Sequence, residues 1–176
     1  MIFIDGENLS VRYERMVKDQ GKLPNPNVLF DPARFLWHQN LAALWPLEIF
    51  RVLYYTSIVG THDDLAALED RISGVEWKFK SLVGQVVPRV FKKAKGGDKT
   101  KSVDINICID VLRHCHASDV DVVVLMSGDG DYLPLLREVM RNGKQAYVAA
   151  FSDGLNPAIR RTVDSFQSLD RHFFQQ

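Results

Sequence analysis

The most regular feature of the chain is an alternation of short apolar runs with longer stretches of helical hydrophobic spacing. The apolar runs predict strands at residues 2–5, 47–56, 75–91 (in one or two pieces), 121–127 and 145–150. Helical spacing predicts helices near residues 8–20, 32–44, 62–73, 102–117, 131–141 and 155–163. Strands that alternate with helices are typical of βαβ units. We therefore expect an α/β fold with a mainly parallel central sheet and helices on both faces.

Two segments depart from this alternation. The stretch DQGKLPNPNVLFDP contains three prolines and two asparagines, which predicts an excursion without regular structure over residues 21–32. Near the end of the chain, SFQSLD predicts a short final strand. No internal repeat and no long linker divides the sequence, so we expect one domain over residues 1–176.

Acidic residues follow the ends of two predicted strands. The run from Val122 to Leu125 is apolar on both faces, as in a parallel strand that helices cover on both sides. Asp129 and Asp131 come directly after it, and Asp5 ends the first strand. Because α/β folds keep their chemistry at the carboxyl ends of parallel strands, we expect these side chains at one edge of the sheet.

A further aspartate opens a predicted helix. Ser102 is a suitable N-cap for this helix, and Asp104 follows in its first turn. At 100° per residue, Asp104 lies within about 40° of Val111 and Cys115. We therefore expect Asp104 at the start of the helix face that packs on the sheet, whereas Asp110 faces solvent or a neighbouring loop.

Carboxylates gathered from separate strand–helix junctions repel one another unless a cation compensates. Mg²⁺ prefers such oxygen ligands, and in this setting it activates water and stabilises charge on a phosphate. The acids that favour this metal site are Asp5, Asp104, Asp129 and Asp131. A purely structural interpretation stays open for each of them, because acids also cap helices and complement helix N-termini. Asn8 either caps the next helix or contacts substrate.

A basic segment leads directly into Asp104. Residues 89–101, RVFKKAKGGDKTK, carry a net charge of plus five. Its cations are Arg89, Lys92, Lys93, Lys95, Lys99 and Lys101. We expect the lysines to hold nucleic-acid phosphates beside the metal site; a solvated lysine loop is the alternative. Candidate surfaces for the stacking of unpaired bases are Tyr13, Tyr132, Trp37 and Phe91, with a core position as the alternative for Trp37 and Phe91.

Composition limits the class of protein. With 46% hydrophobic and 25% charged residues, the chain is of the globular kind, and its apolar runs are too short to cross a bilayer. The net charge is zero, so affinity for nucleic acid must come from a local patch. The start of the chain does not resemble a secretory signal, which predicts a cytoplasmic location. Cys108 and Cys115 lie about 10 Å apart along one helix, too far for a disulfide.

Three blocks of the sequence resemble the signature motifs of NYN domains, the LabA-like branch of the PIN-like nuclease superfamily. They are FIDGENL, KSVDINICIDVL and VLMSGDGDYLPLL, in the family's order and spacing over nearly the whole chain. The resemblance implies a three-layer, Rossmann-like PIN fold that binds Mg²⁺ or Mn²⁺ and cuts RNA. It places the family's acidic positions at Asp5, Asp104, Asp129 and Asp131. Asn8 and Ser127 are the supporting polar groups. Many relatives lack so long a segment as residues 21–32.

We therefore predict a metal-dependent ribonuclease that hydrolyses phosphodiester bonds of single-stranded RNA through a metal-activated water at a four-aspartate site. The alternative is an RNA-binding or protein-interaction module of the same fold that does not cut. Four acids argue against it, since a binder would gain by losing negative charge near phosphates. A phosphatase of the haloacid dehalogenase type would need the motif DxDGT, and the DGENL that begins at Asp5 lacks its second aspartate and its threonine. PIN-like domains commonly dimerise, which leaves a homodimer open.

Overall fold

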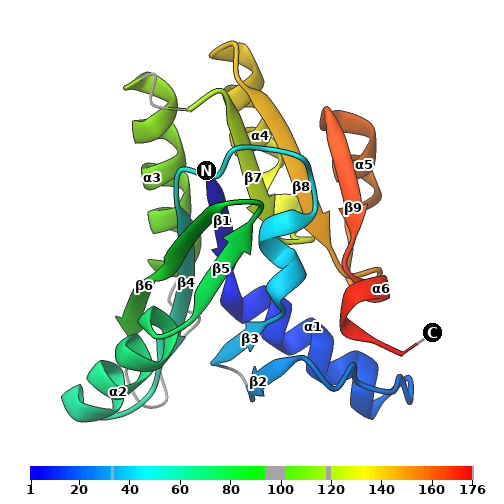
Figure 1. Cartoon of the computed structure of the whole chain (residues 1–176). Coiled ribbons are helices and arrows are strands. Elements are labelled where there is room, and N and C mark those ends of the chain that lie inside the picture. Colours follow the sequence, from blue (N-terminus) through cyan, green and yellow to red (C-terminus); the bar gives the residue numbers. More distant parts are fainter. Residues whose placement is uncertain (33, 94–101, 118–119, 176) are drawn as a thin grey trace.

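A computed structural model describes residues 1–32, 34–93, 102–117 and 120–175, in which strands and helices alternate (Figure 1). The elements in chain order are β1 (Ile2–Asp5), α1 (Gly6–Lys18), β2 (Leu29–Asp31), β3 (Phe35–Trp37), the 3₁₀ helix η1 (Gln39–Ala43), β4 (Val52–Ile58), α2 (His62–Ser73), β5 (Glu76–Phe79), β6 (Leu82–Lys92), α3 (Ser102–His116), β7 (Val122–Met126), the 3₁₀ helix η2 (Gly130–Tyr132), α4 (Leu133–Arg141), β8 (Gln145–Ala150), α5 (Pro157–Thr162), β9 (Ser165–Ser168) and α6 (Asp170–Phe173).

The central sheet has a change of direction in its strand order. Its strands run β5-β6-β4-β1-β7-β8-β9, and neighbours are parallel except for the β5–β6 hairpin. From β1 the chain builds outward through β4 and β6, then crosses to the other side of β1 to form β7. In such a sheet, the crevice at the carboxyl ends of the two strands beside the crossing is the usual place for a ligand. Here those strands are β1 and β7.

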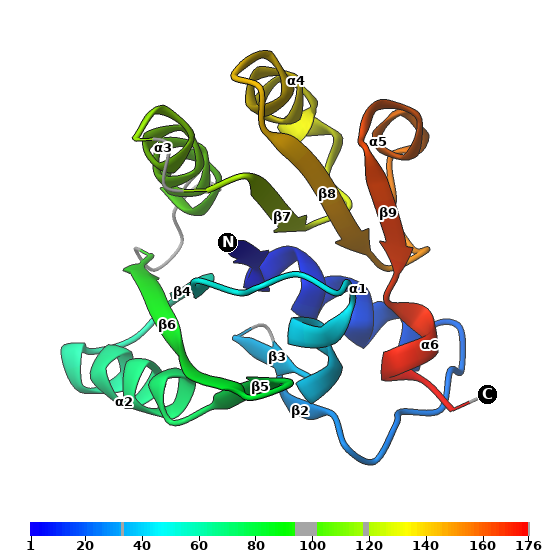
Figure 2. The ribbon, with the colours of Figure 1, turned by 45° about the horizontal axis from the view of Figure 1, so that its top comes forward.

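Helices cover both faces of the sheet (Figure 2). Alternate side chains of β1 point to opposite faces, as the two-residue period of a strand requires. Phe3 packs in the core cluster shared with α3, α4 and α5, whereas Ile2 and Ile4 pack in the cluster shared with α1, α2, α6 and the β2–β3 hairpin. The expected three-layer α/β fold with a mainly parallel sheet is therefore confirmed.

Most of the predicted elements are present. The run over residues 75–91 divides into β5 and β6, and SFQSLD contains β9. The predicted helix over residues 131–141 begins with the 3₁₀ turn η2 before α4. Helix α6 has no counterpart among the sequence predictions, since its four residues are too few to show a helical period.

The predicted helix over residues 32–44 is wrong. The structure has the β2–β3 hairpin and η1 there instead. Phe35, Leu36 and Trp37 are buried in succession, which a strand between two layers permits and a helix with one apolar face does not. Periodicity alone does not separate a short apolar strand from a helical segment.

The excursion over residues 21–32 contains more regular structure than the sequence predicts. Strand β2 begins inside it at Leu29, and Pro24 forms an isolated antiparallel bridge with Phe174. The backbone N–H of Asn25 donates to the carbonyl of Phe173 at 2.9 Å. This segment therefore fastens the last residues of the described chain to the α1 side of the sheet.

Gly6 marks a close approach between α1 and the sheet. A Cβ at this position would lie 2.2 Å from Cε1 of Tyr54, a fully buried ring whose hydroxyl accepts the backbone N–H of Leu36 at 2.8 Å. Gly6→Ala must therefore displace the ring, and we expect it to lower the free energy of unfolding by about 1–3 kcal/mol in urea denaturation. Gly74→Ala is the control, because Gly74 has a φ of −69° and an added Cβ comes no closer than 3.3 Å to a neighbour. Equal losses in the two variants would contradict the explanation.

Candidate active site

Asp5 lies at the carboxyl edge of the sheet, where β1 ends and α1 begins. It is the last residue of β1 and the N-cap of α1, where its Oδ1 accepts the backbone N–H of Asn8 at 3.0 Å. Its Oδ2 accepts hydrogen bonds from Ser127 Oγ at 3.1 Å and from the Tyr132 hydroxyl at 3.3 Å. The residue is 3% exposed. The helix cap and the proposed ligand are therefore the same carboxylate, held by groups from β1, α1 and the segment after β7.

The surroundings of Asp5 disfavour its negative charge. Burial raises the pKa of this carboxyl from 3.8 to about 7, although the hydrogen bonds from Asn8 and Ser127 act in the opposite direction. The nearby carboxylates of Asp104 and Glu7 raise the pKa further. A carboxylate that is buried beside like charges is stabilised by a cation.

Tyr132 links Asp5 to the carboxylate of α3. Its hydroxyl lies 3.3 Å from Asp5 Oδ2 and 3.1 Å from Asp104 Oδ1. A phenol has one proton to donate, so it cannot satisfy both oxygens at once. The two oxygens also lie within about 6 Å of each other, because each is at hydrogen-bond distance from the same atom. The fold thus brings a pair of carboxylates from β1 and α3 to one point.

Asp104 shares the electrostatic character of Asp5. Its side chain is half-buried, and burial raises its pKa. Repulsion from Asp129, Glu7 and Asp131 raises the pKa further, while the hydrogen bond from Tyr132 lowers it. All four predicted aspartates therefore lie near enough at this edge for their charges to act on Asp104 or on one another.

Asp129 and Asp131 lie in the turn after β7, and this turn has a structural role as well. Asp129 is the N-cap of η2 and accepts the backbone N–H of Asp131 at 3.0 Å. The Asp129 N–H donates to Ser127 Oγ at 3.3 Å, and the Gly128 N–H donates to Asn8 Oδ1 at 3.3 Å. The capping interpretation is thus correct for Asp129. Asn8 uses its side chain to join α1 to this turn.

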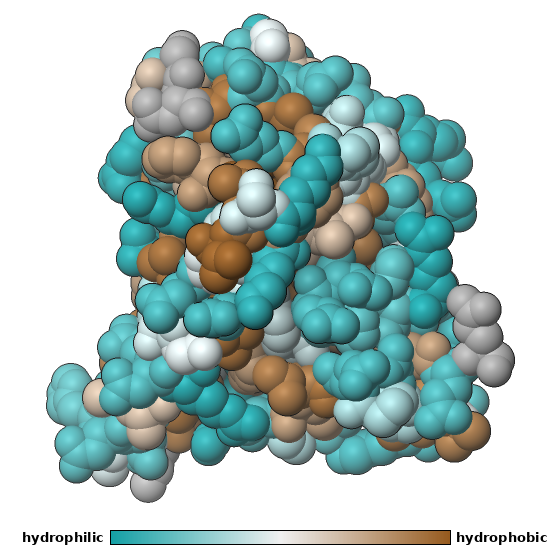
Figure 3. All heavy atoms as spheres, viewed as in Figure 1, coloured by the Kyte–Doolittle hydropathy of each residue, from teal (hydrophilic) through white to brown (hydrophobic). Residues whose placement is uncertain are grey.

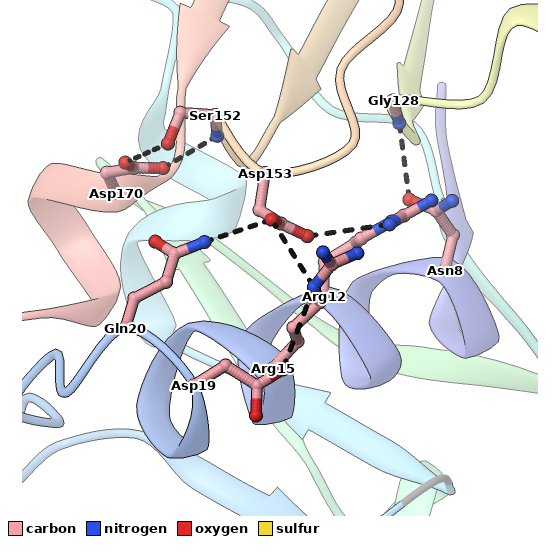
Figure 4. Close-up of polar contacts among 9 residues, drawn as sticks. All are labelled: Asn8, Arg12, Arg15, Asp19, Gln20, Gly128, Ser152, Asp153 and Asp170. Carbon is pink, nitrogen blue, oxygen red and sulfur yellow. Dashed lines mark hydrogen bonds and ion pairs between the residues drawn. The ribbon is translucent and has the colours of Figure 1, made fainter.

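A second contact holds α1 against the carboxyl edge (Figure 4). Arg12 pairs with Asp153 at 3.4 Å in the segment after β8, and Asp153 also accepts a hydrogen bond from Gln20 at 2.9 Å. Together with the Asn8–Gly128 contact, these bonds connect α1 to the segments that follow two different strands. The first turn of α1, which carries the Asp5 cap, is therefore fixed relative to β7 and β8.

The four aspartates do not form a closed metal cage. Across the described residues, no three histidine, cysteine, aspartate or glutamate side chains are placed to hold an ion together. Mg²⁺, however, usually takes only one or two protein carboxylates and completes its shell with waters and substrate phosphate. Asp5 and Asp104 meet that requirement, since both offer oxygen donors and both have raised pKa values. The residues present therefore fit a divalent cation.

Helix α3 has its predicted orientation but not its predicted N-cap. Ser102 is its first residue rather than its N-cap, and within the described part of the chain the Ser102 hydroxyl has no hydrogen-bond partner. The buried stripe of the helix consists of Val103, Ile107, Val111 and Cys115. Asp104 is half-buried at the start of the face that carries Val111 and Cys115, as the helical spacing predicts. Cys108 and Cys115 are both free, as their spacing predicts.

Asp110 does not simply face solvent. It accepts a hydrogen bond from the Tyr55 hydroxyl at 2.8 Å and pairs with Arg113 at 3.1 Å. Arg89, one of the cations of the basic segment, lies 3.8 Å from it. The helical spacing correctly places Asp110 away from Asp104 on the helix. The contacts with Tyr55 and Arg89 depend on the register of β4 and β6, in which these two residues are paired.

Glu7 is a neighbour of this site that the sequence pattern does not single out. The Glu7 carboxylate accepts hydrogen bonds from the Ser57 hydroxyl and from Lys93 Nζ, the latter at 2.7 Å. Its position two residues after the end of β1 was the signal that could have found it. Lys93, predicted as a free phosphate ligand, is thus an ion-pair partner in this structure.

The rest of the basic segment is described only in part. Lys92 is exposed at the end of β6. Lys95, Lys99 and Lys101 lie outside the described residues, so their role stays a prediction.

The candidate stacking residues are mostly in the core. Tyr13 and Tyr132 are buried, the latter with 2% exposure, so the prediction of these two as base-stacking surfaces is wrong. Trp37 is buried too, as the alternative of a core position expects. Phe91 is half-buried against the cluster on the α3 side. Aromatic side chains bury large apolar areas, and here that tendency decides their place.

The larger cavity of the protein, about 450 Å³, is far from the aspartates. It is lined by Met1, Ile2 and Val122 at the starts of β1 and β7, which is the opposite edge of the sheet. Apolar side chains gather near the N-terminus on the face shown in Figure 3. The candidate active site at the carboxyl edge is defined by the charges of its aspartates.

The three-layer fold, with carboxylates at its switch point, is consistent with an α/β domain of the PIN-like class. The model of one family, the NYN domain, matches residues 1–170, and the chain belongs to this family, whose members are generally nuclease-like. The resemblance of the three sequence blocks to NYN domains is thereby confirmed.

One solved structure shares the fold. It is the crystal structure of a protein of unknown function from Vibrio parahaemolyticus RIMD 2210633, with a TM-score of 0.64 and 19% sequence identity. The similarity covers 99% of this chain and 94% of that chain, and at this identity it shows the fold alone. No curated protein matches the chain. None of the described helices is long and apolar enough to cross a membrane.

Proposed function

We propose that this protein is a divalent-cation-dependent ribonuclease of the LabA-like NYN branch, with a site made by Asp5, Asp104, Asp129 and Asp131. The observation that carries the proposal is the pair of carboxylates, Asp5 and Asp104, that meets at one tyrosine hydroxyl. Two acids with raised pKa values at a strand switch point have no stabilising cation of their own within the described residues. A divalent cation, Mg²⁺ or Mn²⁺, accounts for this arrangement.

The four aspartates and their polar neighbours have different roles in this proposal. Asp5 and Asp104 hold the cation, which supplies Lewis acidity toward water and the phosphate. Asp129 uses Oδ1 to cap its own turn, and its second oxygen accepts a hydrogen bond from the attacking water. Asp131, exposed at the rim, contributes charge. Ser127 and Asn8 fix the relative positions of β1, α1 and the turn after β7.

The same proposal assigns the basic segment to RNA binding. Lys92 is exposed where β6 ends, beside the carboxyl edge. Lys95, Lys99 and Lys101 continue the segment in sequence toward Asp104 and complete the proposed phosphate ligands. Such contacts supply affinity without sequence preference. A cytoplasmic location and a homodimer stay predictions from the sequence.

A non-cleaving RNA-binding or interaction module is the second candidate. One observation favours it: Asp129 already serves as a helix cap, and the described residues contain no three-ligand metal set. A catalytic role for Asp129 therefore has to coexist with its structural role.

The experiment is a cleavage assay with end-labelled single-stranded RNA, the matching DNA and p-nitrophenyl phosphate. We expect RNA cleavage with Mn²⁺ or Mg²⁺ and none with a chelator, because the site has no other source of Lewis acidity. Cleavage that continues unchanged in the chelator contradicts the proposal. Hydrolysis of the small ester alone indicates a phosphatase, and retention of intact RNA indicates the binding module.

A further inference from the structure

A second, smaller cavity lies beside the candidate active site. It has a volume of about 290 Å³ and opens at the carboxyl ends of β4 and β6. Its lining includes Glu7, Val11, Arg34, Ile58, Val59 and Lys93. Glu7 faces both places: its charge acts on Asp5 and Asp104, and its carboxylate pairs with Lys93 in the cavity.

The lining combines cations with exposed aliphatic side chains. Arg34 and Lys93 are its positive groups; Arg34 interacts electrostatically with Asp64 but forms no ion pair within 4 Å among the described residues. Val11 and Val59, both in the lining, are 51% and 48% exposed, which is unusual for valines. Ile58, also in the lining, is buried. Cations bind phosphate, and aliphatic surface binds the flat face of a base or ribose.

The size of the cavity limits its ligand. Pockets for small organic ligands begin at about 300 Å³, which makes this one suitable for a single nucleotide unit and too small for a duplex. Its wall is shared with the proposed cation site through Glu7. A strand whose phosphate lies at Asp5 and Asp104 would therefore have its adjoining nucleotide at the cavity.

We propose that this cavity is a nucleotide subsite, in which Lys93 and Arg34 bind a phosphate and Val11 and Val59 contact the attached ribose or base. The inference rests on the proposed ribonuclease function and adds where the strand lies relative to the carboxylates. In the free protein the Glu7 carboxylate holds Lys93 at 2.7 Å. An incoming phosphate replaces Glu7 as the partner of that ammonium group.

This exchange predicts effects of opposite sign. Lys93→Ala and Arg34→Ala remove charge-assisted hydrogen bonds to the phosphate and should each weaken nucleotide binding about tenfold. Glu7→Gln keeps an acceptor for Ser57 but removes the competing negative charge, so it should strengthen binding severalfold. A purely structural role for the Glu7–Lys93 pair would not make one variant bind more tightly than the wild type.

The test is isothermal titration calorimetry of the whole chain with adenosine 5′-monophosphate, in a chelator at constant pH and ionic strength. Lys78→Ala is the matched control, because Lys78 is 70% exposed on β5, beside the beginning of β6 and away from the carboxyl edge. Inorganic phosphate is the second probe, and it should bind more weakly than the nucleotide because it cannot contact Val11 and Val59. Thermal unfolding checks that each variant is folded.

The outcomes separate the subsite from the nuclease activity. The inference holds if nucleotide binding falls in the two alanine variants and rises in Glu7→Gln, with Lys78→Ala unchanged. It is overturned if binding is insensitive to Lys93→Ala and Arg34→Ala, or if phosphate binds as tightly as the nucleotide. Asp104→Asn should lose RNA cleavage and keep nucleotide binding in the chelator. If the wild type cleaves RNA but substitution of Lys93, Arg34 or Glu7 does not change nucleotide binding, the proposed subsite is wrong and the proposed ribonuclease function still stands.

Discussion

Asparagine in place of Asp5 is expected to reduce cation-dependent RNA cleavage by at least about a thousandfold and to stabilise the metal-free protein. The loss of cleavage follows because a neutral amide is a poor ligand for a divalent cation. The gain in stability follows because Asp5 is 3% exposed and lies beside the carboxylate of Asp104.

The geometry of the site allows Asp5→Asn to fold without strain. An asparagine Oδ1 accepts the Asn8 N–H as the aspartate does, and asparagine is an equally good N-cap. Its amide N–H groups can donate to Ser127 Oγ and to the Tyr132 hydroxyl, which both accept as well as donate. The variant thus keeps the hydrogen bonds and removes the buried charge.

The measurements are gel-based RNA cleavage with Mn²⁺ and urea denaturation in a chelator. Asp63→Asn is the control, because Asp63 is an exposed acid in the first turn of α2, and neither its cleavage nor its stability should change by a large factor. Full activity in Asp5→Asn would remove Asp5 from the site. A large loss of stability in the chelator would show that the carboxylate is structural.

The raised pKa of Asp5 also gives the metal-free protein a pH dependence of definite sign. The folded protein keeps a proton on Asp5 up to about pH 7, whereas the unfolded chain releases it near pH 3.8. Since the folded state binds more protons, the free energy of unfolding falls as the pH rises through this window. Asp5→Asn should flatten that part of the profile. Urea denaturation at several pH values in a chelator tests this, and identical profiles would contradict it.

Tyr132→Phe is expected to weaken Mn²⁺ binding about tenfold and to reduce RNA cleavage by 10- to 100-fold, on the order found for groups that orient metal ligands. The hydroxyl is the one group that contacts both Asp5 and Asp104 among the described side chains. Without it, the two carboxylates lose their shared donor and the constraint on their orientation. The ring stays in its buried position, so the fold is kept.

Calorimetric titration with Mn²⁺ separates this positioning role from a structural one. A structural role would lower the unfolding temperature and leave the Mn²⁺ affinity of the folded protein unchanged. Tyr147→Phe is the matched control, because among the described residues its hydroxyl contacts Gln145 at 3.4 Å, and Tyr147 pairs with Val124 in the middle of β7, away from the carboxyl edge. Wild-type affinity for Mn²⁺ in Tyr132→Phe would show that the bridge has no part in cation binding.

Much of the fold was predictable because its signals are local. The apolar run that becomes β7 stops at a polar turn, and the run that becomes β1 stops at Asp5, so both strand ends could be read from a few residues. The helix predicted over residues 32–44 failed for the opposite reason. Its consecutive apolar residues suit either element, and the choice depends on Tyr54, whose hydroxyl accepts the Leu36 N–H from β4.

In the candidate site, too, some features were predictable from local sequence and others depended on tertiary contacts. Chain pattern placed the four aspartates at strand and helix ends, and the three NYN blocks identified the family. The sequence pattern did not decide whether Asp129 caps its own turn, because each of the four carboxylates had both a structural and a functional interpretation. The sequence pattern also assigned Lys93 to phosphate binding, but it did not predict the ion pair between Lys93 and Glu7. Substitution of Glu7 now provides a test of that assignment.

The sequence by itself determined most of the order of strands and helices along the chain, the acids at their ends and the membership of the NYN family. These are properties of short windows, in which hydrophobic period and motif spacing are already complete. Only the tertiary structure decided that Tyr132 contacts Asp5, which is 127 positions away in the sequence, and Asp104, which is 28 positions away. The same holds for the contact between Lys93 and Glu7, which are 86 positions apart. Those contacts depend on the strand order, which brings β1, β7 and α3 together and has no counterpart in any local pattern.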